Sequence, residues 1–148
     1  MDYILQFLLA LGASVGFGIM FNVPRRALLF CGIAGGFGWV VYSLIMNSLE
    51  QNIIAAFLGS AVLTFISYIF ARTLKMPVIV FIVCGIIPLV PGGLAYEAMR
   101  HIVIDEYQLA IEFIFQVGLV SGAIAVGILF GEAVNQMYLG IKKRVIRI

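Results

Sequence analysis

The stretch Pro88-Leu89-Val90-Pro91-Gly92-Gly93 interrupts an apolar segment that begins at Pro77. At about 1.5 Å of rise per residue, the helix from Pro77 to Pro88 would cover roughly 17 Å of a hydrocarbon core that is about 30 Å thick. The break is therefore predicted to lie inside a bilayer. Proline and glycine free backbone groups that lipid cannot satisfy, so the break should face protein or a water-filled cavity. Many transporters build a substrate site from such a broken helix.

The composition also indicates a membrane protein. Of the 148 residues, 64% are hydrophobic and 11% are charged, and the mean hydropathy is +1.16. Such a chain has no room for a separate soluble domain, so residues 1–148 are expected to form one integral-membrane domain in a cell membrane. The net charge of +2 is explained by basic residues beside the membrane, and no nucleic-acid partner is expected.

The apolar stretches of spanning length predict an all-α membrane protein with five transmembrane helices. The fourth helix is expected to be discontinuous, with its break at residues 88–93. The predicted helices cover residues of about 3–21, 27–46, 53–70, 77–104 and 113–137.

The basic residues predict the orientation of these helices. Eight of the nine follow the first, third or fifth helix: Arg25, Arg26, Arg72, Lys75, Lys142, Lys143, Arg144 and Arg147. By the positive-inside rule, the N-terminus should lie outside and the C-terminus in the cytoplasm.

Small residues at helical spacing predict close contacts between helices. Glycines recur four residues apart in the pairs Gly12 and Gly16, Gly118 and Gly122, and Gly127 and Gly131. The third helix carries a stripe of small, weakly polar residues: Ala56, Ser60, Thr64, Ser67 and Ala71. This stripe either packs against a neighbouring helix or lines a path.

After the break, Leu94 is predicted to open a half-helix on which Glu97, Arg100 and His101 share one face. The N–H groups and positive dipole end at its start would attract an anion such as a carboxylate, and Arg100 could hold that group through two hydrogen bonds. The alternative is an amphipathic helix at the outer interface, with an ion pair between Glu97 and Arg100. His101 is also compatible with a hydrogen-bonded interface residue.

Glu132 lies about 15 Å along the helix before Lys142, which predicts a position within the inner leaflet. It shares a face with small and polar residues: Gly118, Ser121, Ala125, Asn135 and Gln136. This face should point toward protein or a polar cavity. Because burial favours a protonated carboxyl group, Glu132 is a candidate proton-coupling residue. The alternative is a snorkelling or ion-paired packing residue.

Three stretches carry a recognisable pattern: Gly16-Phe17-Gly18; Phe21-Asn22-Val23-Pro24 with Arg26-Ala27-Leu28; and Ile87-Pro88-Leu89-Val90-Pro91-Gly92 followed by Ala95-Tyr96 and Met99. Together they resemble the threonine/serine exporter family, specifically its small-subunit half. The resemblance spans essentially the whole chain, and the proline-glycine signature is its most specific part.

The resemblance implies a subunit of a secondary exporter of small hydrophilic carboxylates, namely threonine and serine or a dicarboxylate such as succinate. Proton coupling is expected. It also implies a larger partner subunit of the same family or, failing that, a homo-oligomer. Together with the broken helix, it gives the candidate substrate-binding residues Pro88, Pro91, Gly92, Gly93, Tyr96, Glu97 and Arg100.

A second class remains open: a non-transporting membrane subunit that stabilises or localises a partner, with the break as a folding device. An enzyme is not expected, because the chain has a single His and no paired His or Cys ligands. For the same reason neither a metal nor a cofactor is expected.

Overall fold

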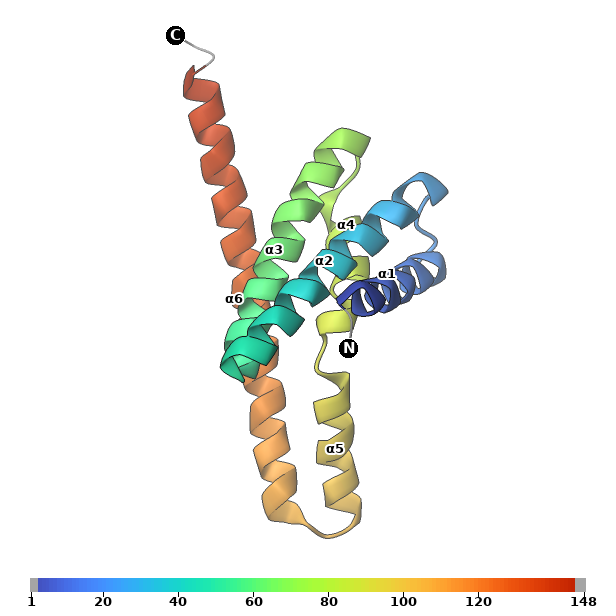
Figure 1. Ribbon diagram of the computed structural model, residues 1–148, viewed down its shortest axis with the longest axis vertical. Coiled ribbons are helices and arrows are strands. Elements are labelled where there is room, and N and C mark those ends of the chain that lie inside the picture. The colour runs from blue at the N-terminus through green and yellow to red at the C-terminus, as the bar shows by residue number, and fades with distance from the viewer. Residues whose placement is uncertain (1–2, 146–148) are drawn as a thin grey trace.

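The structure is a computed structural model that describes residues 3–145, with the side chains of residues 3–138 (Figure 1). Every regular element in this part of the chain is helical. The elements are α1 (Tyr3–Met20), α2 (Arg25–Leu49), α3 (Asn52–Leu74), α4 (Val78–Gly85), the 3-10 helix η1 (Ile87–Leu89), α5 (Gly92–Val103) and α6 (Tyr107–Val145).

The prediction of an all-α membrane protein is confirmed. Within residues 3–145, the helices α1, α2, α3 and α6 are each long and apolar enough to cross a bilayer. The bent pair Val78–Leu89 and Gly92–Val103 supplies a fifth span if its two parts are counted together.

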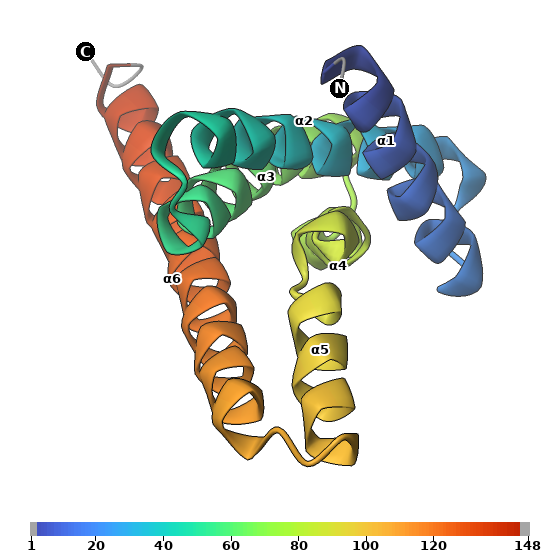
Figure 2. The same ribbon diagram turned by 60° about the horizontal axis from the view of Figure 1, so that its bottom comes forward.

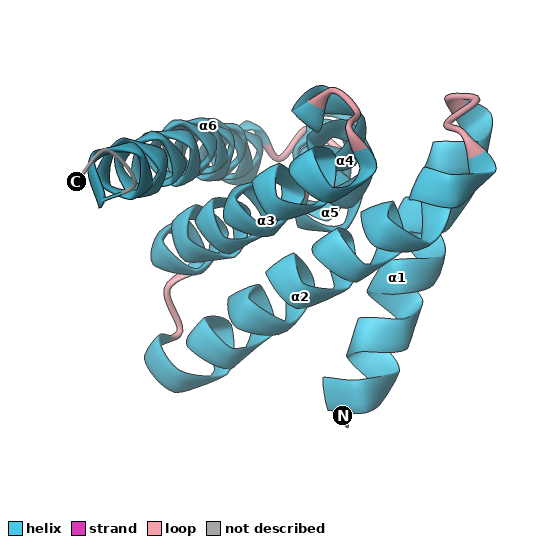
Figure 3. Cartoon of the chain, turned by 90° about the horizontal axis from the view of Figure 1, so that it is seen from above, coloured by secondary structure: helices cyan, strands magenta, loops and turns pink. Residues whose placement is uncertain are grey.

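The helices α2 and α3 form the centre of the bundle. Helix α1 crosses α2, while α3 packs against both α2 and α6 (Figure 3). Glycines bring the two central helices together, because a Cβ atom built on Gly59 would lie only 2.9 Å from the carbonyl oxygen of Gly38. Among the described elements, α5 makes extensive contact only with α6, and the α5–α6 hairpin extends beyond the other helices (Figure 2).

Several helices are longer than the apolar segments that predicted them. Helix α6 begins at Tyr107 instead of about residue 113, because Glu112 is an exposed helical residue and not part of a connection. Hydropathy marks which residues suit lipid, whereas backbone geometry decides where a helix ends. The helices α2 and α3 are each followed by a residue in the left-handed conformation, Glu50 with φ of 53° and Lys75 with φ of 52°.

The glycine pairs behave differently from one another. A Cβ atom on Gly127 would lie 2.4 Å from the carbonyl oxygen of Phe57, and one on Gly131 would lie 2.8 Å from that of Ala61, so this pair forms the close α3–α6 crossing. The other two pairs have nothing within 4 Å of a Cβ atom: Gly12, Gly16, Gly118 and Gly122. The predicted close contact is therefore confirmed for one pair and is absent for the other two within the described chain.

The small-residue stripe of α3 packs in this structure. Its members Ala56, Ser60, Thr64 and Ser67 are fully buried, and Ala71 is 8% exposed. Ser60 and Thr64 lie directly beneath the glycines of α6. The packing interpretation is therefore confirmed.

Arg25 and Arg26 begin α2 beside the α1–α2 connection, and Lys75 lies in the α3–α4 connection. Both connections lie at the same end of the bundle as the C-terminal part of α6 (Figure 1). The α2–α3 and α5–α6 connections lie toward the opposite end. Arg72 lies in the last turn of α3, and the other four predicted basic residues lie outside the described side chains: Lys142, Lys143, Arg144 and Arg147.

Candidate functional site

The predicted break lies between α4 and α5, where the chain bends by 50° between Val78–Leu89 and Gly92–Val103. Its physical cause is the pair Pro88 and Pro91, since neither residue has an N–H group to continue a helical hydrogen-bond ladder. Leu89 between them is only 3% exposed and packs in the main core with residues of α2, α3 and α6. The break is therefore anchored by one buried side chain while its backbone changes direction.

The glycine side of the break is uncovered. Gly92 and Gly93 are exposed, and a Cβ atom on either would meet no heavy atom within 4 Å. The first turn of α5, which begins at Gly92 and not at Leu94 as expected, has no side-chain cap. Within the described chain the break therefore faces protein only on the side of Leu89, because α5 packs on α6 and leaves the glycine side open.

Pro88 borders a hollow of about 370 Å³ between α1, α2 and η1. Gln6 and Trp39 also line this hollow. The Oε1 atom of Gln6 is buried and has no hydrogen-bond partner among the described residues. The rest of the lining is apolar, with Leu9, Ala10 and Ala13 beside Pro88 and Trp39.

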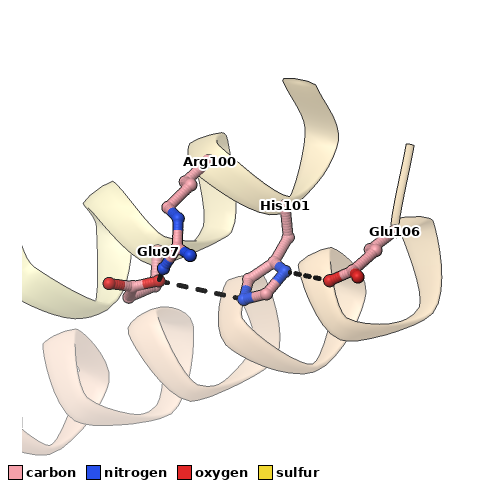
Figure 4. Close-up of polar contacts among 4 residues, drawn as sticks. All are labelled: Glu97, Arg100, His101 and Glu106. Carbon is pink, nitrogen blue, oxygen red and sulfur yellow. Dashed lines mark hydrogen bonds and ion pairs between the residues drawn. The ribbon is translucent and has the colours of Figure 1, made fainter. Parts of the chain in front are cut away.

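The charged residues of α5 engage one another (Figure 4). Arg100 Nη1 lies 2.9 Å from Glu97 Oε2, and His101 Nδ1 lies 2.7 Å from Oε2 of Glu106, which immediately precedes α6. His101 Nε2 also lies 3.8 Å from Glu97 Oε2. We call these four residues the α5 cluster.

His101 also joins the two arms of the hairpin. Its side chain is 13% exposed, and its ring stacks on Phe113 of α6 with centroids 5.4 Å apart and planes 7° apart. This geometry agrees with the interface interpretation of His101. Arg100 and Tyr96, by contrast, are largely uncovered, with a 54% exposed side chain and a 67% exposed residue respectively.

A second polar cluster lies where α3 and α6 separate beyond their crossing (Figure 1). Here Arg72 Nη2 donates a hydrogen bond to Asn135 Oδ1, and Gln136 Nε2 donates to Glu132 Oε1 at 3.2 Å. These four residues line a hollow of about 410 Å³ together with Tyr68, and we call it the α3–α6 groove. Of the predicted Glu132 face, Glu132, Asn135 and Gln136 line this hollow, whereas Gly118, Ser121 and Ala125 are exposed in the described chain.

From the sequence alone, Arg72 is predicted only as part of the basic cytoplasmic border and not as a site residue. Its partner Asn135 is 63 residues away in the chain and only 3% exposed. Without knowledge of how α3 crosses α6, the sequence carries no signal that joins these residues. In the described part of the chain, no group of three or more His, Cys, Asp or Glu side chains could hold a metal ion.

The fold and these features define a multi-pass helical membrane protein with one broken span. The model of the family described as "Threonine/Serine exporter, ThrE" matches residues 6–134, so the chain belongs to this family of exporter-type transporters. A relative from Haemophilus influenzae, described as an uncharacterized protein, is 36% identical over 91 residues. The match covers 61% of this chain but only 30% of that relative's length. No solved structure matches the chain.

Proposed function

We propose that the chain is one subunit of a secondary exporter of small hydrophilic carboxylates, such as threonine and serine or the dicarboxylate succinate. Membership of the exporter family supports this function. The observation that carries the proposal is the uncovered break at residues 88–93. Lipid cannot satisfy the uncapped amide groups at the start of α5, so a partner or an aqueous path must meet them.

The proposed orientation has the N-terminus outside and the C-terminus in the cytoplasm. It is supported by Arg25 and Arg26 at the start of α2 and by Lys75 in the α3–α4 connection, which lie at one end of the bundle. In this orientation the α3–α6 groove opens toward the cytoplasm and the α5–α6 connection lies outside. Substrate would then be taken up near Glu132 and leave past the break.

The proposed partner is a larger subunit of the same family, or else a second copy of this chain. The pair Gly118 and Gly122 supports this, since it offers a smooth helix face that nothing in the described chain covers. Gly127 and Gly131 on the same helix illustrate how closely another helix can approach such a face.

The proposed substrate contacts outside the groove are the residues of the break and of the uncovered face of α5: Pro88, Pro91, Gly92, Gly93, Tyr96, Glu97 and Arg100. Arg100 must leave Glu97 before it can bind a substrate carboxylate. Glu132 is the proposed proton carrier, because it lines a polar hollow on a membrane-spanning helix.

A non-transporting subunit is the second candidate. The α5 cluster favours it, because the charges of Glu97 and Arg100 are already matched within the hairpin and Glu106 already contacts His101. In this case the break would only shape a surface for a partner protein.

Transport into vesicles separates the two candidates. The purified chain, alone and with a larger family member, is reconstituted, and uptake of labelled threonine and succinate is measured with and without a proton gradient. An exporter subunit should give gradient-driven transport that requires this chain. Transport by the partner alone at the full rate would overturn the proposal.

The substitution Gly92→Val tests the role of the break. Because the Cβ position of Gly92 is open, the isolated chain should keep its melting temperature. Transport by the assembled protein should be lost, since the side chain would enter the space reserved for the partner or substrate. Gly12→Val, at an open glycine far from the break in sequence, is the control. Wild-type transport by the Gly92 variant would remove the break from the substrate path.

A further inference from the structure

We propose that the α3–α6 groove binds the zwitterion of a small α-amino acid, with Arg72 at its carboxylate and Glu132 at its ammonium group. The inference rests on the proposed export function and goes beyond it. It names where the cytoplasmic substrate binds and which pair of charges the substrate carries.

The groove owes its existence to the way α3 and α6 cross. Gly127 and Gly131 hold the helices in close contact, and beyond that point the helices separate (Figure 1). The resulting hollow of about 410 Å³ falls near the lower end of the range of small-molecule pockets, about 300–1,000 Å³. It is suited to a ligand the size of an amino acid.

Opposite charges line this groove without neutralising each other. Within the described side chains, no ion pair of 4.0 Å or less joins Arg72 to Glu132. Each has a neutral amide partner instead: Asn135 accepts a hydrogen bond from Arg72, and Gln136 donates one to Glu132. The amides orient both charged groups and leave their charges available to a ligand.

This arrangement discriminates between substrate classes. An α-amino acid carries one carboxylate and one ammonium group, which complement the arginine and the glutamate. A dicarboxylate would bring a second negative charge toward Glu132, and repulsion of like charges opposes its binding. The groove therefore favours threonine or serine over succinate.

The headgroup of phosphatidylethanolamine carries a similar pair of charges, an anionic phosphate and an ammonium group. The groove lies between two membrane-spanning helices, so lipid is a competing source of the same chemistry. We commit to the free amino acid as the occupant. The lipid composition of the test membrane distinguishes the two sources.

The test measures binding of labelled L-threonine to the full chain in phosphatidylcholine nanodiscs. L-Threonine methyl ester, which lacks the carboxylate, and succinate, which lacks the ammonium group, should each bind at least about tenfold more weakly. Arg72→Gln and Glu132→Gln should each weaken threonine binding by a similar factor, about tenfold or more. Glu132→Gln should also reduce the difference in binding affinity between threonine and succinate, because the charge that attracts ammonium and repels a second carboxylate is removed.

Arg26→Gln is the matched control for Arg72→Gln, and Glu112→Gln is the matched control for Glu132→Gln. Each control removes a charge of the same sign from an exposed position outside the groove. They should stay within about twofold of the wild type. Unchanged threonine binding in both groove variants, or equal affinity for threonine and succinate, would overturn the inference. Loss of threonine binding when phosphatidylethanolamine replaces phosphatidylcholine would assign the groove to lipid.

Failure of this inference can be distinguished from failure of the proposed function. If the assembled protein exports carboxylates but the Arg72 and Glu132 variants bind threonine normally, the site is wrong and the function stands. If the assembled protein transports neither threonine nor succinate, the proposed function itself fails.

Discussion

The α5 cluster and the α3–α6 groove contain similar charged groups in opposite states. In the α5 cluster, Arg100 lies 2.9 Å from Glu97 and His101 lies 2.7 Å from Glu106. In the groove, Arg72 and Glu132 line one hollow and contact neutral amides instead. A polar helix face is therefore a better candidate for a binding site where its charged side chains do not already pair with one another.

The difference follows from sequence separation and packing. Members of the α5 cluster lie within ten residues of one another, so helical spacing and one short connection bring them together. The groove residues come from α3 and α6, which touch at Gly127 and Gly131 and then separate. The space between separating helices keeps the opposite charges apart.

The largest expected effect comes from breaking the crossing that forms the groove. Gly127→Val would place a side chain against Ser60 and the carbonyl oxygen of Phe57, where backbone cannot move aside. Overpacking of this kind costs about 1–3 kcal/mol or more. The melting temperature in detergent should fall clearly, or the folded chain should not be recovered.

Gly122→Val is the matched control, since its Cβ position on the same helix is open. It should leave the melting temperature of the isolated chain unchanged. Equal destabilisation by both variants would mean that the α3–α6 crossing is not as close as described.

The second largest effect is expected on transport, from a substitution in the α3–α6 groove. Arg72→Gln should reduce the initial rate of threonine transport by the assembled protein about tenfold or more, because a charge-assisted contact to the carboxylate is lost. The residue is exposed at the end of α3, so folding should be preserved. A wild-type transport rate with normal expression would exclude Arg72 from the substrate path.

The smallest effect is expected at the α5 cluster. Arg100→Gln removes an uncovered ion pair, which contributes about 0.2–1 kcal/mol to stability. Because Glu97 already holds Arg100, transport should fall only a few-fold. A loss larger than that of Arg72→Gln, measured in the same vesicle assay, would reverse the comparison and make α5 the main carboxylate site.

Much of the fold is predictable from the sequence because hydropathy and proline-glycine chemistry act locally. The membrane-spanning character, the break at residues 88–93 and the ion pair between Glu97 and Arg100 all follow from neighbouring residues. Helix ends are less predictable: α6 continues through Glu112 because a polar residue does not terminate a helix.

Only part of the candidate site is predictable from the sequence, because the rest depends on which helices contact each other in the fold. Glu132 stands out as a lone acid in an apolar helix, but its relation to Arg72 depends on the crossing of α3 and α6. The same limit applies to the glycines. The pairs Gly118 with Gly122 and Gly127 with Gly131 have the same spacing. Within the described chain, however, only Gly127 and Gly131 contact another helix.

Protection of an introduced thiol tests whether the α3–α6 groove, rather than the α5 cluster, is the main site at which the substrate binds. Gln136→Cys lies in the groove and Glu106→Cys lies in the α5 cluster, while the natural Cys31 and Cys84 are buried. Labelling by a polar thiol reagent is timed in vesicles with and without saturating threonine. Threonine should slow labelling at position 136 and leave labelling at position 106 unchanged. Protection at position 106 alone would contradict the assignment of the groove as the main site.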